Sequence, residues 1–198
     1  MGSSESTPNP PPRTEVPLLI VLAEEDDPRK CSGRRLLRAG FAAEVPVSRA
    51  PPSSAVVLDP HASVPLSRDD RPGALRSGVL VVDCSWNRIG RHGRYPTEVP
   101  WLARMPVRRR LPWLVAANPQ HHGRLAELNT AEALAASLVV LGESARAHRL
   151  LEPFAGGASF FDINAAPLAA YAAANGADGV IAAESAGWEP PGGPAASP

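Results

Sequence analysis

Asp83-Cys84-Ser85-Trp86 places a carboxylate, a thiol, a hydroxyl and an indole in direct succession. The apolar run Val79–Val82 comes directly before them, and the turn-forming Ser77-Gly78 precedes that run, so a buried strand is predicted. Ligands of open α/β sheets bind beyond the carboxyl ends of the strands. We therefore expect Asp83 and Trp86 to contact a ligand. The alternative interpretations are a helix-capping carboxylate and an ordinary core tryptophan.

Three further apolar segments predict the other strands of the sheet: Pro17–Leu22, Val45–Val47 and Ala55–Leu58. Between the first two, Asp27–Leu37 predicts a loop that enters a short helix, with Ser32 as its N-cap. A helix N-terminus exposes free N–H groups that suit a carboxylate or a phosphate. Ser32 is therefore a candidate ligand contact, although a cap with no further role is the simpler alternative.

The second half of the chain is predicted to be mainly helical. Asn129-Thr130-Ala131-Glu132 has the form of a capping box. Leu134, Leu138 and Leu141 then recur on one face, so one stripe of this helix should be buried before Gly142 ends it.

Other segments carry weaker signals. Short helices are predicted over residues 97–104, 145–151 and 178–184 and from Asn164 onward, a polar connection over 67–77, and a strand and loop over 111–119. Since strands come first and helices last, the sheet should belong mainly to the N-terminal two-thirds.

The net charge is zero, with 20 basic and 20 acidic residues, so only the distribution of charge suggests a partner. Seven arginines but a single acid, Glu98, lie between Arg88 and Arg110. Such a local excess suits a nucleic-acid backbone, and a solvated loop is the alternative. The candidate phosphate contacts are Arg34, Arg35, Arg108, Arg109 and Arg110.

Other classes of protein are disfavoured by the composition. The two cysteines, Cys31 and Cys84, form neither a metal-binding pattern nor a disulfide framework, so a reduced, cytoplasmic setting is expected. His121-His122 has no further ligand at metal-binding spacing, and we predict no metal. No apolar run reaches the roughly 18 residues that a membrane span needs. Residues 1–14 and 188–198 are expected to be disordered.

Five segments, taken together and in order, resemble the small-subunit rRNA aminocarboxypropyltransferase family. They are Asp27–Gly33, Leu58-Asp59-Pro60, Asp83–Trp86, Leu111–Pro119 and Leu128–Ala133. Any one of them alone would be a weak signal, whereas five in family order are specific. The resemblance covers roughly Pro17–Gly187.

The resemblance implies a fold and an activity. The fold would be α/β, with a small N-terminal α/β lobe over residues 15–77, followed by a SPOUT-like knotted α/β domain over 78–187 with a helical C-terminal part. The activity would be transfer of the 3-amino-3-carboxypropyl group of S-adenosyl-L-methionine (SAM) to N3 of N1-methylpseudouridine in small-subunit rRNA. Methylthioadenosine would leave, and the enzyme would act as a monomer in ribosome maturation.

The resemblance also assigns roles to residues. Leu58, Pro60 and Trp86 would surround the adenine of SAM, and the backbones of Val82 and Leu111 would bind adenine and ribose. Ser32 and Thr130 would hold the amino-acid end, and Ala126 would complete the SAM site. Since uridine N3–H is a weak acid, a positioned base would help the attack, and Asp83, at the end of the predicted central strand, is our candidate for the catalytic carboxylate.

This chain departs from the family pattern at Asn118–Gly123, where Gln120-His121-His122 replaces the usual residues, and at Ala126, which is often larger. Two alternative functions remain. A transferase acting on tRNA uridine is suggested by the similar Asp-x-Thr-Trp motif of the DTW-domain enzymes. A non-catalytic RNA-binding assembly factor is the alternative from another class.

Overall fold

The computed structural model describes residues 13–23, 31–83 and 99–187. These residues form a five-stranded parallel sheet in the order β2-β1-β4-β3-β5. The strands are β1 (Leu18–Leu22), β2 (Ala43–Glu44), β3 (Val56–Leu58), β4 (Val79–Asp83) and β5 (Arg108–Arg109). Because all five run the same way, their carboxyl ends meet at one edge of the sheet.

The two faces of the sheet pack against different parts of the chain. Val79 and Val81 belong to the larger core cluster, whereas Leu80 and Val82 belong to a smaller one, as the alternation of side chains along a strand requires. The larger cluster includes the helices α1 (Ser32–Arg38), α2 (Arg71–Ser77) and α4 (Thr130–Val140). The smaller one is completed by residues 99–105, which contain the short 3₁₀ helix η2 (Leu102–Arg104).

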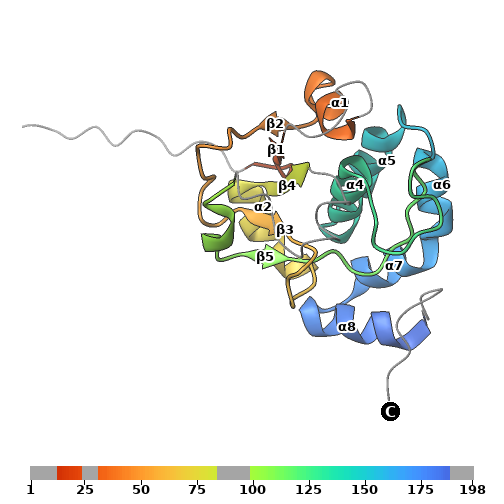
Figure 1. Ribbon diagram of the computed structural model, residues 1–198. Coiled ribbons are helices and arrows are strands. Elements are labelled where there is room, and N and C mark those ends of the chain that lie inside the picture. Colours follow the sequence, from red (N-terminus) through yellow and green to blue (C-terminus); the bar gives the residue numbers. More distant parts are fainter. Residues whose placement is uncertain (1–12, 24–30, 84–98, 188–198) are drawn as a thin grey trace, which may run out of the picture.

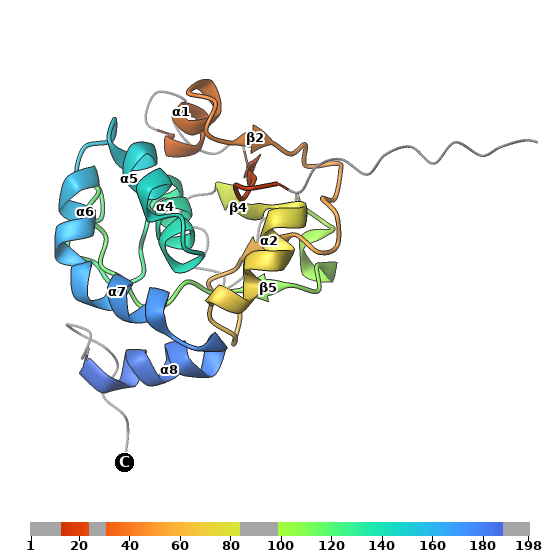
Figure 2. The same ribbon diagram turned by 180° about the vertical axis from the view of Figure 1, so that it is seen from behind.

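Helices occupy the rest of the molecule beside the sheet (Figure 1). They are α5 (Ser144–Leu151), α6 (Gly157–Ile163), α7 (Ala165–Ala173) and α8 (Gly176–Gly187), and a 3₁₀ helix, η1 (Arg68–Asp70), precedes α2. Figure 2 shows α2 lying across the sheet on the side turned away in Figure 1. Helix α4 packs against β4, α1, α5 and α7, so it is the central helix. None of the described helices is long and apolar enough to cross a membrane.

Several predicted elements are confirmed. The strand over Val79–Val82 is β4, the strands predicted over 17–22 and 55–58 are β1 and β3, and the capping box opens α4 at Asn129. The helices predicted over 145–151 and 178–184 are α5 and the middle of α8.

Other predictions were wrong for identifiable reasons. Residues 67–77 form η1 and α2 rather than a polar connection, because Pro72 fits the first turn of a helix. All residues of α4, not one stripe, are buried, since this helix is enclosed by other elements. The strand expected within 111–119 instead precedes that segment, at Arg108–Arg109, and α6 covers a segment for which no helix was predicted.

The expected division between residues 77 and 78 does not separate two sheets. Strand β4, after that boundary, lies between β1 and β3, which both come before it. The mixed α/β class is confirmed, while the knot and the division into lobes stay predictions.

Candidate functional site at the carboxyl edge of the sheet

The carboxyl edge of the sheet brings together most of the predicted ligand contacts. Val82 and Asp83 end β4, Leu58 ends β3 with Pro60 two residues beyond, and Leu111 follows β5 at the same distance. Leu58 and Val82 are buried, whereas Pro60 is exposed. Segments separated by as many as 53 positions in sequence, from Leu58 to Leu111, thus reach one edge.

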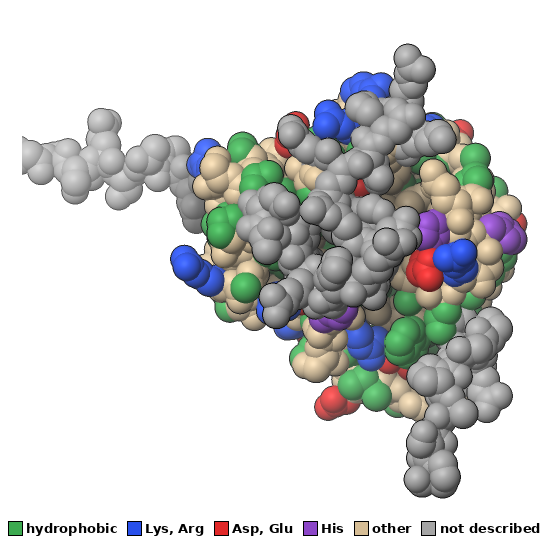
Figure 3. Space-filling view, in the orientation of Figure 1, with side chains coloured by type: hydrophobic (Ala, Val, Ile, Leu, Met, Phe, Trp, Pro, Cys, Tyr) green, Lys and Arg blue, Asp and Glu red, His purple; other side chains and the backbone are tan. Residues whose placement is uncertain are grey.

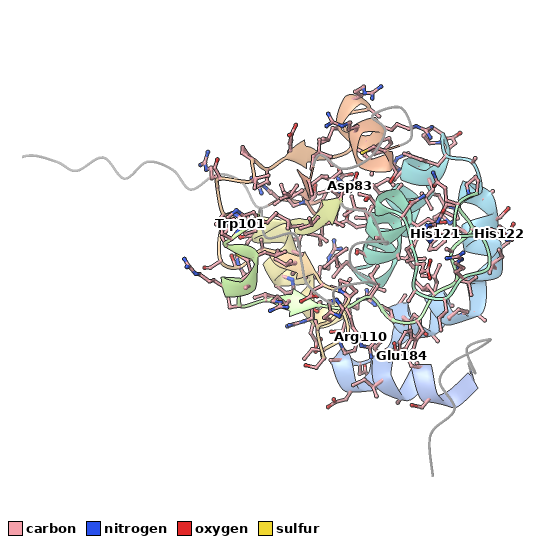
Figure 4. The ribbon with its side chains drawn as sticks, in the orientation of Figure 1. Asp83, Trp101, Arg110, His121, His122 and Glu184 are labelled. Carbon is pink, nitrogen blue, oxygen red and sulfur yellow. The ribbon has the colours of Figure 1, made fainter. Side chains whose placement is uncertain are left out.

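Asp83 ties the end of β4 to the first turn of α1. Its Oδ2 accepts a hydrogen bond from the Cys31 thiol at 2.9 Å and another from the Gly33 N–H at 3.0 Å. A carboxylate at this position also interacts favourably with the helix dipole. Figure 4 shows Asp83 below α1, at the end of its strand. The helix-capping interpretation of Asp83 is therefore confirmed, and its role in a reaction stays untested.

The contacts of Asp83 involve two residues at the start of α1, Cys31 and Gly33. Cys31, not Ser32 as predicted, is the N-cap of α1, and its sulfur accepts the Arg34 N–H. Burial and the hydrogen bond to Asp83 raise the pKa of the Cys31 thiol to about 12, so this thiol stays protonated. A side chain at Gly33 would displace the Asp83 carboxylate, because an added Cβ would lie 2.1 Å from Asp83 Oδ2. Ser32, as the first helical residue, lies between these two fixed positions.

Thr130 begins α4 and is buried, and a network around Glu132 fixes the start of this helix. Glu132 is 3% exposed. Its Oε1 accepts the Ala117 N–H at 2.8 Å, and its Oε2 accepts Asn118 Nδ2 at 2.6 Å and the Asn129 N–H at 3.0 Å. The sequence indicates the capping box, but it carries no signal for the bonds from residues 117 and 118.

These bonds attach a hairpin, residues 114–126, to the start of α4. The Val115 and Leu125 positions form an antiparallel bridge, and Gly123 turns the chain with φ +80°. Ala126 has φ +58°, a conformation that costs a residue with a Cβ about 1–2 kcal/mol. Its N–H donates to the Leu114 carbonyl at 2.8 Å. The strained backbone of Ala126 is thus held in place four residues before Thr130.

The hairpin carries a histidine–carboxylate pair. His121 Nδ1 lies 2.5 Å from Glu127 Oε2, and Arg124 contacts the same oxygen at 3.1 Å. Burial tends to raise the pKa of Glu127, but the hydrogen bonds from Arg124 and His121 outweigh it and lower the pKa. Figure 4 shows His121 and His122 next to each other, and Figure 3 shows histidine, acidic and basic side chains gathered on this face.

The three consecutive arginines predicted to bind phosphate all have carboxylate partners. Arg108 Nε donates to Asp59 at 2.6 Å, Arg109 Nε to Asp70 at 3.0 Å, and Arg110 forms a bidentate pair with Glu184 at 2.6 and 2.7 Å. These partners come from the loop after β3, from η1 and from α8. The three ion pairs connect different elements to β5 and the residue after it. Internal pairing therefore balances the charges of these three arginines.

Two of the remaining predicted residues, Arg34 and Arg35, lie on α1. Arg35 donates to the Pro153 carbonyl at 2.8 Å, and its guanidinium lies 4.2 Å from the centre of the Phe154 ring. Arg34 is partly exposed on α1. Trp86, predicted to line the adenine slot, lies outside the described residues.

Fold and site together define an α/β protein with a candidate ligand site at the carboxyl edge of a parallel sheet, beside the N-terminus of α1. Residues 56–188 match the family described as "Ribosome biogenesis protein, C-terminal". The chain belongs to this family. Residues 16–49 also match the family described as "Possible Fer4-like domain in RNase L inhibitor, RLI". An iron–sulfur cluster needs about four thiolates, and this segment contains one cysteine, so the match does not predict a cluster here.

Curated relatives share much of the sequence. A protein of Methanosarcina acetivorans named 16S rRNA aminocarboxypropyltransferase is 36% identical over 89% of this chain and 97% of its own length. An 18S rRNA aminocarboxypropyltransferase of Schizosaccharomyces pombe is 37% identical over 79% of this chain and 52% of that protein. Among solved structures, the SAM-dependent rRNA:acp-transferase Tsr3 from Vulcanisaeta distributa is similar, with a TM-score of 0.72 and 38% identity. That match covers 80% of this chain and 83% of the Tsr3 chain.

Proposed function

We propose that this protein transfers the 3-amino-3-carboxypropyl group of SAM to N3 of a uridine-type base, N1-methylpseudouridine, in small-subunit rRNA. The observation that carries the proposal is the 36% identity to a 16S rRNA aminocarboxypropyltransferase over nearly the whole of both chains. The Tsr3 structure, described as SAM-dependent, supports SAM as the co-substrate. We expect a cytoplasmic monomer that acts during ribosome maturation.

The residues at the carboxyl edge suit the parts of SAM. Leu58 and Pro60, with Trp86, would supply apolar surface for the flat adenine, and the backbones of Val82 and Leu111 would supply hydrogen bonds. Ser32 and Thr130 are each the first residue of a helix, and the dipole at a helix N-terminus favours a carboxylate such as that of SAM. Ala126 would lie beside the same amino-acid end.

The reaction depends on which carbon of the sulfonium is aligned with the nucleophile. Attack by N3 on the γ-carbon of the methionine arm forms a C–N bond and breaks the bond from that carbon to sulfur. The electron pair stays on sulfur, which becomes the neutral thioether of methylthioadenosine. The proton of N3 must pass to an acceptor. The enzyme therefore has to orient the arm, exclude attack on the methyl group and supply that acceptor.

We assign Asp83 to the first task, orientation. Two donors already bind its Oδ2, and one of them is the N–H next to Ser32. Asp83→Asn should therefore weaken SAM binding and slow transfer together, because the first turn of α1 would shift. A large fall in turnover with unchanged SAM affinity would instead identify Asp83 as the base.

The activity is tested with two labelled forms of SAM and a short rRNA hairpin from the decoding region that carries N1-methylpseudouridine. Label in the SAM carboxyl group should enter the RNA, and label in the methyl group should not. Transfer of the methyl label would show a methyltransferase instead. If neither label enters the rRNA hairpin but the carboxyl label enters tRNA, the DTW-type alternative is correct.

The assembly-factor alternative is tested by calorimetric titration with SAM, methylthioadenosine and S-adenosylhomocysteine. Micromolar binding of SAM and methylthioadenosine supports an enzyme. Binding to none of the three, together with retained affinity for the RNA hairpin, would support a non-catalytic RNA-binding protein.

A further inference from the structure

An exposed apolar patch adjoins the ion pair between Arg110 and Glu184. Four large hydrophobic side chains are exposed among the residues that the structure describes, and three of them lie next to this pair. The Val64 carbonyl accepts the Arg110 N–H at 3.0 Å, and Ile181 neighbours Glu184 on the surface of α8. Trp113, the third, lies beside the Arg110 guanidinium. A single exposed apolar residue needs no explanation, whereas a group around a tryptophan indicates a binding surface.

The backbone of Trp113 is fixed on both sides. Its N–H donates to Glu184 Oε1 at 3.1 Å, and its carbonyl accepts the Tyr171 hydroxyl at 3.1 Å. Burial raises the pKa of Tyr171 to about 12, so this hydroxyl keeps its proton and remains a donor. The Arg110 guanidinium lies 5.6 Å from the centre of the indole ring, within range of a cation–π interaction. Trp113 is nevertheless 40% exposed, so an anchored aromatic ring stays accessible to a ligand.

Trp113 lies next to the candidate SAM site. It comes two residues after Leu111, whose backbone we assign to SAM, and two residues span at most about 7 Å. Arg110, which contacts the indole, extends the hydrogen bonding of β5, because its carbonyl accepts the Leu66 N–H at 2.8 Å. Figure 4 shows Arg110 and Glu184 next to each other, where the end of β5 meets α8. The tryptophan is therefore attached to the carboxyl end of a strand that leads into a proposed SAM contact.

The proposed reaction leaves a base of the RNA without a stacking partner. N3 of a uridine-type base lies on its base-pairing edge, so a paired target cannot be attacked there. The target must be unpaired and turned out of its stack, which costs unstacking energy. A neighbouring base then loses the contact on one of its faces. Proteins that recognise single-stranded RNA stack such bases on aromatic side chains.

We propose that Trp113 stacks on a nucleobase adjacent to the target nucleotide in the RNA. This inference rests on the proposed function. The patch suits a base rather than a phosphate, because Glu184 balances the charge of Arg110 and leaves the indole as the exposed feature. A base is favoured over a protein partner because a group that contacts Trp113 lies close to Leu111, where the RNA must approach SAM. Every base has a π-face, so the contact needs no particular sequence.

The test measures binding of the N1-methylpseudouridine hairpin to Trp113→Leu and Trp113→Phe by fluorescence anisotropy. Loss of one base–aromatic stack lowers affinity about 5- to 150-fold. Trp113→Leu keeps apolar bulk without an aromatic face and should bind at least about fivefold more weakly, whereas Trp113→Phe should stay within about threefold of wild type. Ile163→Ala is the matched control, since it removes a similarly exposed apolar side chain from α6, and it should bind as wild type does.

A cycle of protein and RNA changes separates stacking from a structural role. An abasic nucleotide is placed in turn on each side of the target. At the stacked position it should weaken binding to wild type about as much as Trp113→Leu does, and it should weaken binding to Trp113→Leu no further. The melting temperature, the SAM affinity and the salt dependence of RNA binding should stay at wild-type values in Trp113→Leu, because no charge is removed.

The proposal is overturned if Trp113→Leu binds the hairpin within about twofold of wild type, since one stack contributes at least about fivefold. It is also overturned if neither abasic position couples to Trp113→Leu. A wild-type protein that sediments as a dimer, with Trp113→Leu as a monomer, would show that a second copy covers the indole, and would overturn it too. Failure of the proposed function is seen separately: wild-type protein would form no product from labelled SAM, while coupling to an abasic position would still support stacking.

Discussion

Replacing Glu132 with glutamine should test the attachment of the hairpin to α4. The side chain keeps its shape, but one of its two acceptor oxygens becomes an NH₂ donor. The glutamine amide can be placed in two ways. Fewer hydrogen bonds are lost when its oxygen takes the place of Glu132 Oε2 and accepts from Asn118 and Asn129, while its NH₂ group faces the Ala117 N–H. One buried donor then loses its acceptor and two bonds lose their charge. At about 1.5–3 kcal/mol per hydrogen bond to a charged group, offset by the removed cost of burying a carboxylate, we expect a loss of about 2–3 kcal/mol.

Urea unfolding followed by tryptophan fluorescence measures this loss, with an unchanged m-value as the sign that the native fold is retained. Glu127→Gln is the control, because that carboxylate lies near the same hairpin but is 35% exposed. It should cost at most about 1 kcal/mol. In a double-mutant cycle with Asn118→Ala, the two changes should cost less together than their sum. If Glu132→Gln is as stable as Glu127→Gln, the network does not anchor the hairpin.

Three other changes have calculable outcomes. Gly33→Ala should lower the affinity for SAM, measured by calorimetry, at least tenfold, because the Asp83 carboxylate must move. An unchanged affinity would show that Asp83 does not contribute to SAM binding. In a Cys84→Ser background, Cys31 should react slowly with iodoacetamide at pH 8.5. Its pKa rises from 9.0 to about 12 on folding, so unfolding free energy should fall as the pH rises between these values, a trend that Cys31→Ser should lack. Glu184→Gln should lower unfolding free energy by about 2 kcal/mol by weakening the Arg110 pair, and an unchanged urea midpoint would contradict this.

The elements that were predicted correctly are specified by neighbouring residues. The capping box at Asn129 and Glu132 works within four residues, and the run Val79–Val82 is apolar enough to be a strand in any context. The site is harder to predict because its contacts join distant segments. Asp83 meets Cys31 across 52 positions, and no local pattern distinguishes that contact from solvation.

The arginines show a second limit of sequence analysis. The charge excess before Arg110 is real, yet the sequence does not reveal that Asp59, Asp70 and Glu184 approach from three other elements. Each pairing depends on the order of strands in the sheet and on the return of α8, which are fixed only by the complete fold. At Arg108, Arg109 and Arg110, where the excess of arginine predicted phosphate contacts, the structure has ion pairs.

The hydrogen bonds around the candidate site suit the chemistry of a sulfonium. A sulfonium offers three carbons to a nucleophile, and selection among them requires an arm that cannot turn. Asp83 fixes the first turn of α1, and Glu132 fixes the first turn of α4, each through N–H donors from distant segments. These carboxylates therefore stabilise the positions of two helix N-termini.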